Sequence, residues 1–116
     1  MYAGSRWHLL EALPGSYPEA DPVASLDVSI LQNNLLGPIL GIDDPRTSSR
    51  INFVGGIRGT AELVRRVDRG DYAAAFSLHA TTMDQLLSVA SSGNVMPPKS
   101  TWFEPKLRSG LVIHVL

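Results

Sequence analysis

Proline and glycine set the strongest limit on what this chain can fold into. The sequence contains eight prolines and ten glycines, spread along its length. Proline fixes φ and donates no backbone hydrogen bond, and glycine adopts the left-handed conformations that end helices. We therefore expect short helices and strands, most of them closed by one of these residues.

The first helix is expected to begin at Asp21-Pro22. Aspartate is a favourable N-cap, and proline is favourable at the first helical position. Apolar residues then recur at near-helical spacing. Gly37-Pro38 interrupts or ends this helix, and Gly41 is a suitable stop for any last turn.

Two further helices are expected downstream. One lies between Gly59 and Gly70, and glycine is a common helix stop. The other begins with a capping box of Thr82 and Gln85 and ends at Gly93. Its apolar residues follow the spacing i, i+3, i+4 and i+7 of one helical face: Met83, Leu86, Leu87 and Ala90.

Short apolar runs between these helices predict strands at residues 7–13, 51–54, 72–78, 101–103 and 111–116. The run 72–78 is apolar on both faces, which is typical of a central strand. Strands that alternate with helices favour parallel pairing, and the last two strands would form a hairpin. The predicted class is α+β or α/β, with a mixed sheet of about five short strands and three helices, ending in a β-hairpin. The strand order is left open.

Length and composition predict one domain over residues 1–116, since single domains run to about 100–200 residues. The chain has no cysteine, so disulfides and thiolate chemistry are excluded, and a cytoplasmic location is expected. A net charge of −1 argues against a nucleic-acid partner, which needs a clustered basic face. No apolar run approaches the roughly 18 residues of a membrane span, so no membrane partner is expected.

The stretch of residues 96–106 is the first candidate site. Two prolines stiffen the backbone before Lys99, Ser100 and Thr101, and an aromatic pair follows. A rigid lysine next to two hydroxyl groups suits a phosphate or another anion. The alternative is that prolines and lysines here protect an edge strand from aggregation.

Two loops are further candidates. Gly55, Gly56 and Arg58 lie between an expected strand and a helix, where backbone amides and a guanidinium can bind a phosphate. His79 follows the next strand, so parallel strands would bring both loops to one edge of the sheet. Lys99 joins them if its own strand runs antiparallel to that pair. The alternatives are a tight glycine turn and a surface histidine without a function.

Other chemistry has little support in the sequence. His8, His79 and His114 share no metal-ligand spacing, so no metal site is predicted. No nucleophile elbow supports a serine hydrolase acting through His79. The sequence indicates no particular cofactor.

Several segments together resemble the bacterial family called domain of unknown function 1015. They are Met-Pro-Pro-Lys-Ser-Thr-Trp-Phe-Glu-Pro-Lys at 96–106, Arg-Ser-Gly-Leu at 108–111 and Ile-Asn-Phe-Val-Gly-Gly-Ile-Arg-Gly at 51–59. Asp-Pro-Val at 21–23, Leu-Asp-Val at 26–28 and Leu-Gly-Ile at 40–42 fit in the same order. The chain departs from the family pattern at residues 79–82, where a tyrosine or proline would be expected before the hydroxyls.

The resemblance implies that this chain is the C-terminal fragment of a longer cytoplasmic protein. Members also carry an upstream Asp-Gly-His-His-Arg segment, similar to one in ParB-like proteins and certain kinases of free serine, and this chain lacks it. If the family transfers phosphoryl groups, the chain alone would lack half of the site. We therefore expect no catalytic activity from the isolated chain.

Two functions follow as expectations. The first is a ligand-binding part of a larger protein, possessing a site for a small phosphate or carboxylate at Lys99, Ser100, Thr101, Gly55, Gly56, Arg58 and His79. The parent would then be a nucleotide-dependent phosphotransferase acting on small molecules. The second is a non-catalytic structural or interaction domain that packs against the N-terminal portion of the same protein.

Overall fold

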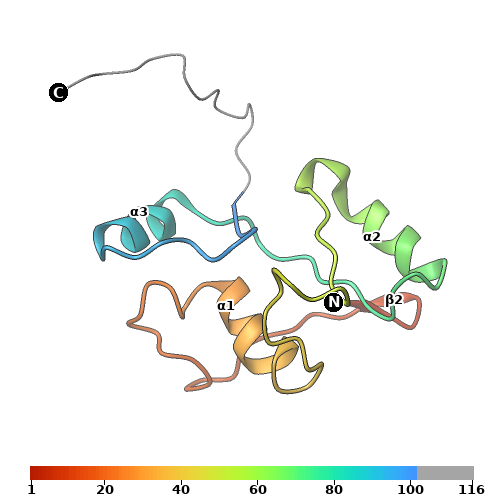
Figure 1. The fold of residues 1–116 in the computed structure, drawn as a ribbon, viewed down its shortest axis with the longest axis horizontal. Coiled ribbons are helices and arrows are strands. Elements are labelled where there is room, and N and C mark those ends of the chain that lie inside the picture. Colours follow the sequence, from red (N-terminus) through yellow and green to blue (C-terminus); the bar gives the residue numbers. More distant parts are fainter. Residues whose placement is uncertain (102–116) are drawn as a thin grey trace, which may run out of the picture.

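The structure is a computed structural model that describes residues 1–101 (Figure 1). Its regular elements are short, as the prolines and glycines predict. No helix in this part of the chain combines the length and apolar character needed to cross a bilayer. The elements in chain order are β1 (Tyr2–Ala3), β2 (Arg6–Trp7), α1 (Asp27–Leu31), the π-helix η1 (Gln32–Leu36), the 3₁₀-helix η2 (Gly56–Arg58), α2 (Gly59–Asp68) and α3 (Met83–Ser91).

The one sheet among residues 1–101 is the antiparallel hairpin of β1 and β2. Gly4 and Ser5 form its turn, with φ values of 57° and 60°. Positive φ at both positions is what a two-residue type I′ turn requires. The rings of Tyr2 and Trp7 pair across the strands with centroids 5.1 Å apart. The sequence analysis missed this hairpin and placed a strand at residues 7–13 instead.

Tyr2 ties the hairpin to distant parts of the chain. It is buried, and its hydroxyl donates a hydrogen bond to Oδ1 of Asp68 at 3.0 Å. Its backbone forms an isolated bridge with Ala75, through hydrogen bonds of 2.7 and 2.9 Å. The hairpin is therefore anchored to the end of α2 and to residues 72–78.

The predicted mixed sheet of about five strands is wrong. Residues 51–54 and 72–78 have an irregular backbone, and the second run pairs with another segment at Ala75 alone. An apolar run forms a strand only where a neighbouring strand pairs with it, because β-propensity depends strongly on context. Thr101 is not in a strand, and the rest of the predicted terminal hairpin lies outside the described residues.

The first predicted helix is present in altered form. The Asp21 carboxylate accepts hydrogen bonds from the amides of Val23 and Ala24, both at 2.8 Å, as expected of a cap. The backbone amides of Ala24 and Val23 hold the pKa of Asp21 below its usual value. The regular helix nevertheless begins later, because Leu26 is extended, with φ −70° and ψ 140°.

This helix changes to π geometry before it ends. The amide of Gly37 donates to the carbonyl of Gln32, and that of Leu40 donates to Leu35, each across five residues. Pro38 has no amide hydrogen and its ring crowds the preceding turn, which accounts for a local departure from α geometry. Gly41 has φ 62°, the left-handed conformation expected after the last turn.

The other two helices confirm their predictions closely. In α3 the hydroxyl of Thr82 accepts from the Gln85 amide at 3.2 Å, and the Gln85 side chain accepts from the Thr82 amide at 2.9 Å. Both helices are followed by left-handed glycines, Gly70 after α2 and Gly93 after α3, with φ values of 81° and 73°.

The core of the described residues is thin. Five hydrophobic side chains are buried, while eleven large hydrophobic side chains stay exposed. Gln32 helps to hold the core together, because its amide donates to the carbonyl of Ile42 at 2.7 Å. The buried residues are Tyr2, Leu26, Leu36, Ile42 and Val89. The helices and the irregular segments therefore cover one another incompletely, and a large hollow remains between them.

Candidate functional site

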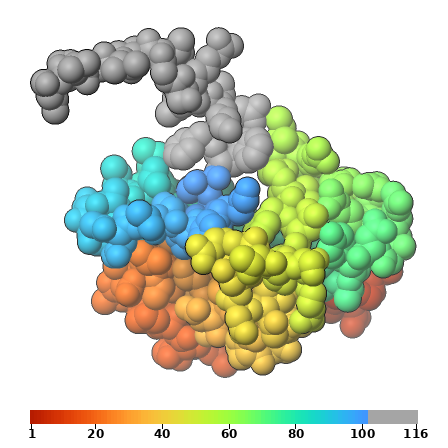
Figure 2. Space-filling view, viewed as in Figure 1, coloured from red at the N-terminus to blue at the C-terminus, as the bar shows by residue number. Residues whose placement is uncertain are grey.

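A large open hollow, which we call the basin, lies between the helices. Its volume is about 1350 Å³. Its wall is formed by residues of α1 and η1, residues 42–46 and 50–56, one face of α2, residues 72–82, the start of α3 and residues 97–101. Figure 2 shows the segment around residues 45–55 at the centre of one face of the molecule, next to the blue end of the described chain. The basin thus gathers segments that are far apart in sequence.

Six of the seven predicted site residues line the basin: Gly55, Gly56, His79, Lys99, Ser100 and Thr101. Arg58 does not line it. These residues were expected at the edge of a sheet, and that edge does not exist in the described structure. Irregular segments, packed against α2 and against each other, bring the loops together instead.

Ser100 holds its own loop in shape. Its hydroxyl donates to the carbonyl of Pro97 at 2.6 Å, and its amide donates to the same carbonyl at 3.3 Å. The hydroxyl of Thr81 donates to the carbonyl of Ser100 at 3.1 Å, which joins the loop of His79 to the loop of Lys99. The Ser100 hydroxyl therefore has a structural bond in addition to its predicted role at a ligand.

Lys99 has an unusual backbone conformation. Its φ is 61°, a left-handed value that non-glycine residues rarely adopt. Such a conformation costs on the order of 1–3 kcal/mol, and it persists where the surrounding structure imposes it. Here the Ser100 turn on one side and Pro98 on the other constrain the residue.

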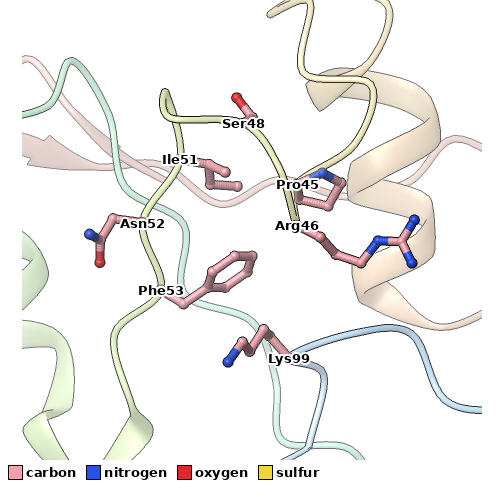
Figure 3. Close-up of a pocket in the computed structure, with 7 residues that line it drawn as sticks. All are labelled: Pro45, Arg46, Ser48, Ile51, Asn52, Phe53 and Lys99. Atoms are coloured by element: carbon pink, nitrogen blue, oxygen red, sulfur yellow. The ribbon is translucent and has the colours of Figure 1, made fainter.

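Lys99 lies on the wall of a smaller hollow of about 250 Å³, which we call the Phe53 pocket (Figure 3). The ring of Phe53 projects between Lys99 and the segment of Pro45 and Arg46. In this view the amine of Lys99 lies just below the ring, the amide of Asn52 points away from the ring, and the guanidinium of Arg46 points away in the opposite direction. The lining residues are Pro45, Arg46, Ser48, Ile51, Asn52, Phe53 and Lys99.

Asn52 is oriented by a chain of polar contacts from α2. Glu62 accepts a hydrogen bond from Nε of Arg66 at 2.7 Å, and Nη1 of Arg66 donates to Oδ1 of Asn52 at 3.2 Å. Because the oxygen of the Asn52 side chain is thus occupied, its amide nitrogen is the group left to donate. Hydrogen bonds from Arg65 and then Arg66 lower the pKa of Glu62 to about 2.

The other cations of the basin are already engaged. Arg46 binds both carboxylate oxygens of Asp44 at 3.0 Å, and Arg50 donates to the carbonyl of Leu40 at 2.7 Å. Arg66 is shared between Glu62 and Asn52. Within residues 1–101, no carboxylate lies within ion-pair distance of Lys99. Lys99 is therefore the basin cation best placed to meet a ligand.

His79 lines the basin but is exposed, and its Nδ1 lies 3.1 Å from the carbonyl of Ala80. Among the described residues, no group of three or more histidine and carboxylate side chains is arranged to hold a metal ion.

The sequence analysis missed four residues of this site: Arg46, Asn52, Phe53 and Arg66. Phe53 and Asn52 were assigned to a strand at residues 51–54, and Arg66 to the helix expected between Gly59 and Gly70. The spacing of Glu62 and Arg66, one helical turn apart, is a signal that could have identified the ion pair. No comparable signal in the sequence joins Asn52 to α2.

Comparisons of this chain with known protein families, with curated proteins and with solved structures find no match. The resemblance to the domain of unknown function 1015 family accordingly stays a prediction.

Proposed function

We propose that the basin binds a small organic anion, a carboxylate or a phosphate ester, with Lys99 as its principal contact. The observation that carries this proposal is the left-handed backbone of Lys99 at the basin wall. Backbone strain of this kind clusters at ligand sites, where the fold imposes a conformation that the residue would not choose.

The surrounding groups support an anion over a cation. The lysine amine, which lies beside the Phe53 ring, offers three donors and no acceptor. Gly55 and Gly56 belong to the same wall and bring backbone close to the ligand without side chains in between. Charge-assisted hydrogen bonds to such an anion are stronger than neutral ones.

The wider role is a ligand-binding part of a larger protein. No complete set of acid, base and nucleophile accompanies the anion site in the described residues, so the isolated chain binds without turnover. The parent protein is a cytoplasmic, nucleotide-dependent phosphotransferase for small molecules in this proposal. The absence of cysteine supports a reducing compartment.

The test compares Lys99→Ala with Arg58→Ala in the full chain. Both substitutions remove one positive charge, but only Lys99 lines the basin. Lost charge-assisted bonds cost about 1.5–3 kcal/mol of binding, so affinity for acetate or inorganic phosphate should fall about 10- to 100-fold in Lys99→Ala alone. Ligand-observed NMR measures this, and melting temperatures check folding. Equal binding by both variants and the wild type would contradict the proposal.

A second function has its own supporting observation. Exposed large hydrophobic side chains outnumber the buried ones by eleven to five among residues 1–101. Large exposed apolar surface is typical of interaction sites. On this hypothesis the chain is a structural or interaction domain that packs against the N-terminal portion of a longer protein. It becomes the better explanation if no anion binds.

A further inference from the structure

The Phe53 pocket offers chemistry that a bare anion would not use. Its wall contains the Phe53 ring, the apolar side chains of Pro45 and Ile51, and the stem of Lys99. Phe53 is 44% exposed, although a residue of this size and apolar character would ordinarily be covered. Small-molecule sites are commonly built this way, with apolar walls and a few polar groups that orient the ligand.

The size of the pocket limits what it can hold. A cavity of about 150 Å³ is large enough for a benzene molecule. The Phe53 pocket has about 250 Å³, which leaves room for one ring and an attached carboxylate or phosphate. It opens into the basin, because six of its seven lining residues also line the larger hollow.

The polar groups indicate where the charged end of such a ligand lies. The Lys99 amine lies beside the Phe53 ring, whereas the Asn52 side chain points away from the ring and is held by Arg66. Arg46 is neutralised by Asp44. A ring packed against Phe53 would therefore direct its anionic substituent toward Lys99.

On the basis of the anion site proposed above, we infer that the natural ligand is an aryl anion with a single ring. Its ring packs against Phe53 in an offset or edge-to-face arrangement, which aromatic pairs prefer. Its carboxylate or phosphate accepts hydrogen bonds from Lys99. The apolar wall of the pocket thus favours a ligand with an aromatic ring, while Lys99 favours a ligand with a negative charge.

The experiment measures affinity by titration calorimetry for two matched pairs of probes in the full chain. Benzoate is compared with acetate, and phenyl phosphate with inorganic phosphate. We expect the aryl member of at least one pair to bind ten-fold or more tightly, and the better pair identifies the anionic group. Phe53→Ala should abolish this preference for the aryl member of the pair.

Two further variants keep the outcome decisive. Phe53→Leu preserves apolar volume if Phe53→Ala fails to fold, and it should still lower the aryl preference several-fold. Ile57→Ala, at an exposed apolar residue outside both hollows, should bind like the wild type. Equal affinity within each pair overturns the aryl inference and leaves the anion site standing. Failure of all four probes overturns both, and aryl binding that is insensitive to Lys99→Ala overturns the orientation proposed here.

Discussion

Helices α2 and α3 are of nearly equal length but are held in place by different means. Helix α3 has a complete capping box at Thr82 and one side chain, Val89, that is 1% exposed. Helix α2 has no side-chain cap and no buried residue. Helix α2 is instead stabilised by ion pairs of Glu62 with Arg65 and Arg66, each at 2.7 Å.

This difference separates a structural helix from one that is connected to the candidate site. The contacts that hold α3 are local in sequence or apolar, although Thr82, Gln85 and Leu86 also line the basin. The ion pairs of α2 continue through Arg66 to Asn52. A change in α2 electrostatics should therefore reach Asn52 in the wall of the Phe53 pocket, whereas a change in the α3 cap should act first on the free energy of unfolding.

The largest expected effect tests the buried anchor of α3. Val89→Ala removes two methyl groups from a buried position, which costs about 0.8 kcal/mol each in addition to a cavity term. We expect the free energy of unfolding to fall by about 2 kcal/mol in urea denaturation. Leu87→Ala, at an exposed position of the same helix, should change it by less than about 0.5 kcal/mol. Similar losses for both variants would show that α3 has no specific anchor.

A smaller effect tests the caps. Thr82→Ala removes the hydroxyl that accepts from Gln85, and the loss of such a cap costs about 1 kcal/mol. Thr60→Ala is the matched change in the first turn of α2, where no side chain caps the helix. It should leave the free energy of unfolding nearly unchanged. If Thr60→Ala proved as harmful as Thr82→Ala, the two helices would not differ at their N-termini.

The smallest effect on stability is expected from Glu62→Gln, since ion pairs near the surface contribute little. The pKa of Glu62 is lowered in the folded chain to about 2 from an ordinary value of 4.5. The stabilisation is therefore present above about pH 4.5 and is lost as the pH falls toward 2. Urea denaturation of both proteins at pH 7 and pH 2.5 should show a wild-type advantage that shrinks at the lower pH.

Asp84→Asn provides the control, since Asp84 lies in the first turn of α3 and forms no ion pair among the described residues. A pH-independent difference between wild type and Glu62→Gln would refute the role of the ion pairs. Binding measurements on the same variant sharpen the comparison. Loss of charge at Glu62 should disturb Arg66 and, through it, the position of Asn52 in the wall of the Phe53 pocket, so the affinity for the anion should change.

The sequence analysis was accurate where the interactions join residues close in sequence, and it failed where they join residues far apart. Helix α3 was predicted with its cap and its stop at Gly93, because these signals lie within a few residues of each other. The strand at 72–78 was predicted wrongly, because an apolar run says nothing about whether a partner lies beside it. The hairpin of β1 and β2 was missed, although Gly4 and Ser5 between two aromatic residues were a usable turn signal.

The candidate site shows the same division. The loops of Gly55, His79 and Lys99 were expected to lie together, and all three line the basin. The reason given for their meeting, a common sheet edge, was wrong. Arg58 lies next to the glycines in sequence and yet outside the basin, and Asn52 owes its orientation to a residue 14 positions away. Contacts between residues so far apart produce no periodic pattern that could be recognised in a single sequence.

The anchoring of Tyr2 has a consequence for how the chain folds. Its hydroxyl meets Asp68 across 66 residues, and its backbone meets Ala75 still further along. Contacts between distant residues form slowly, because a long loop must close before they stabilise anything. During synthesis the hairpin of β1 and β2 emerges before α2 and residues 72–78. The hairpin is therefore expected to become anchored only after those later segments have left the ribosome.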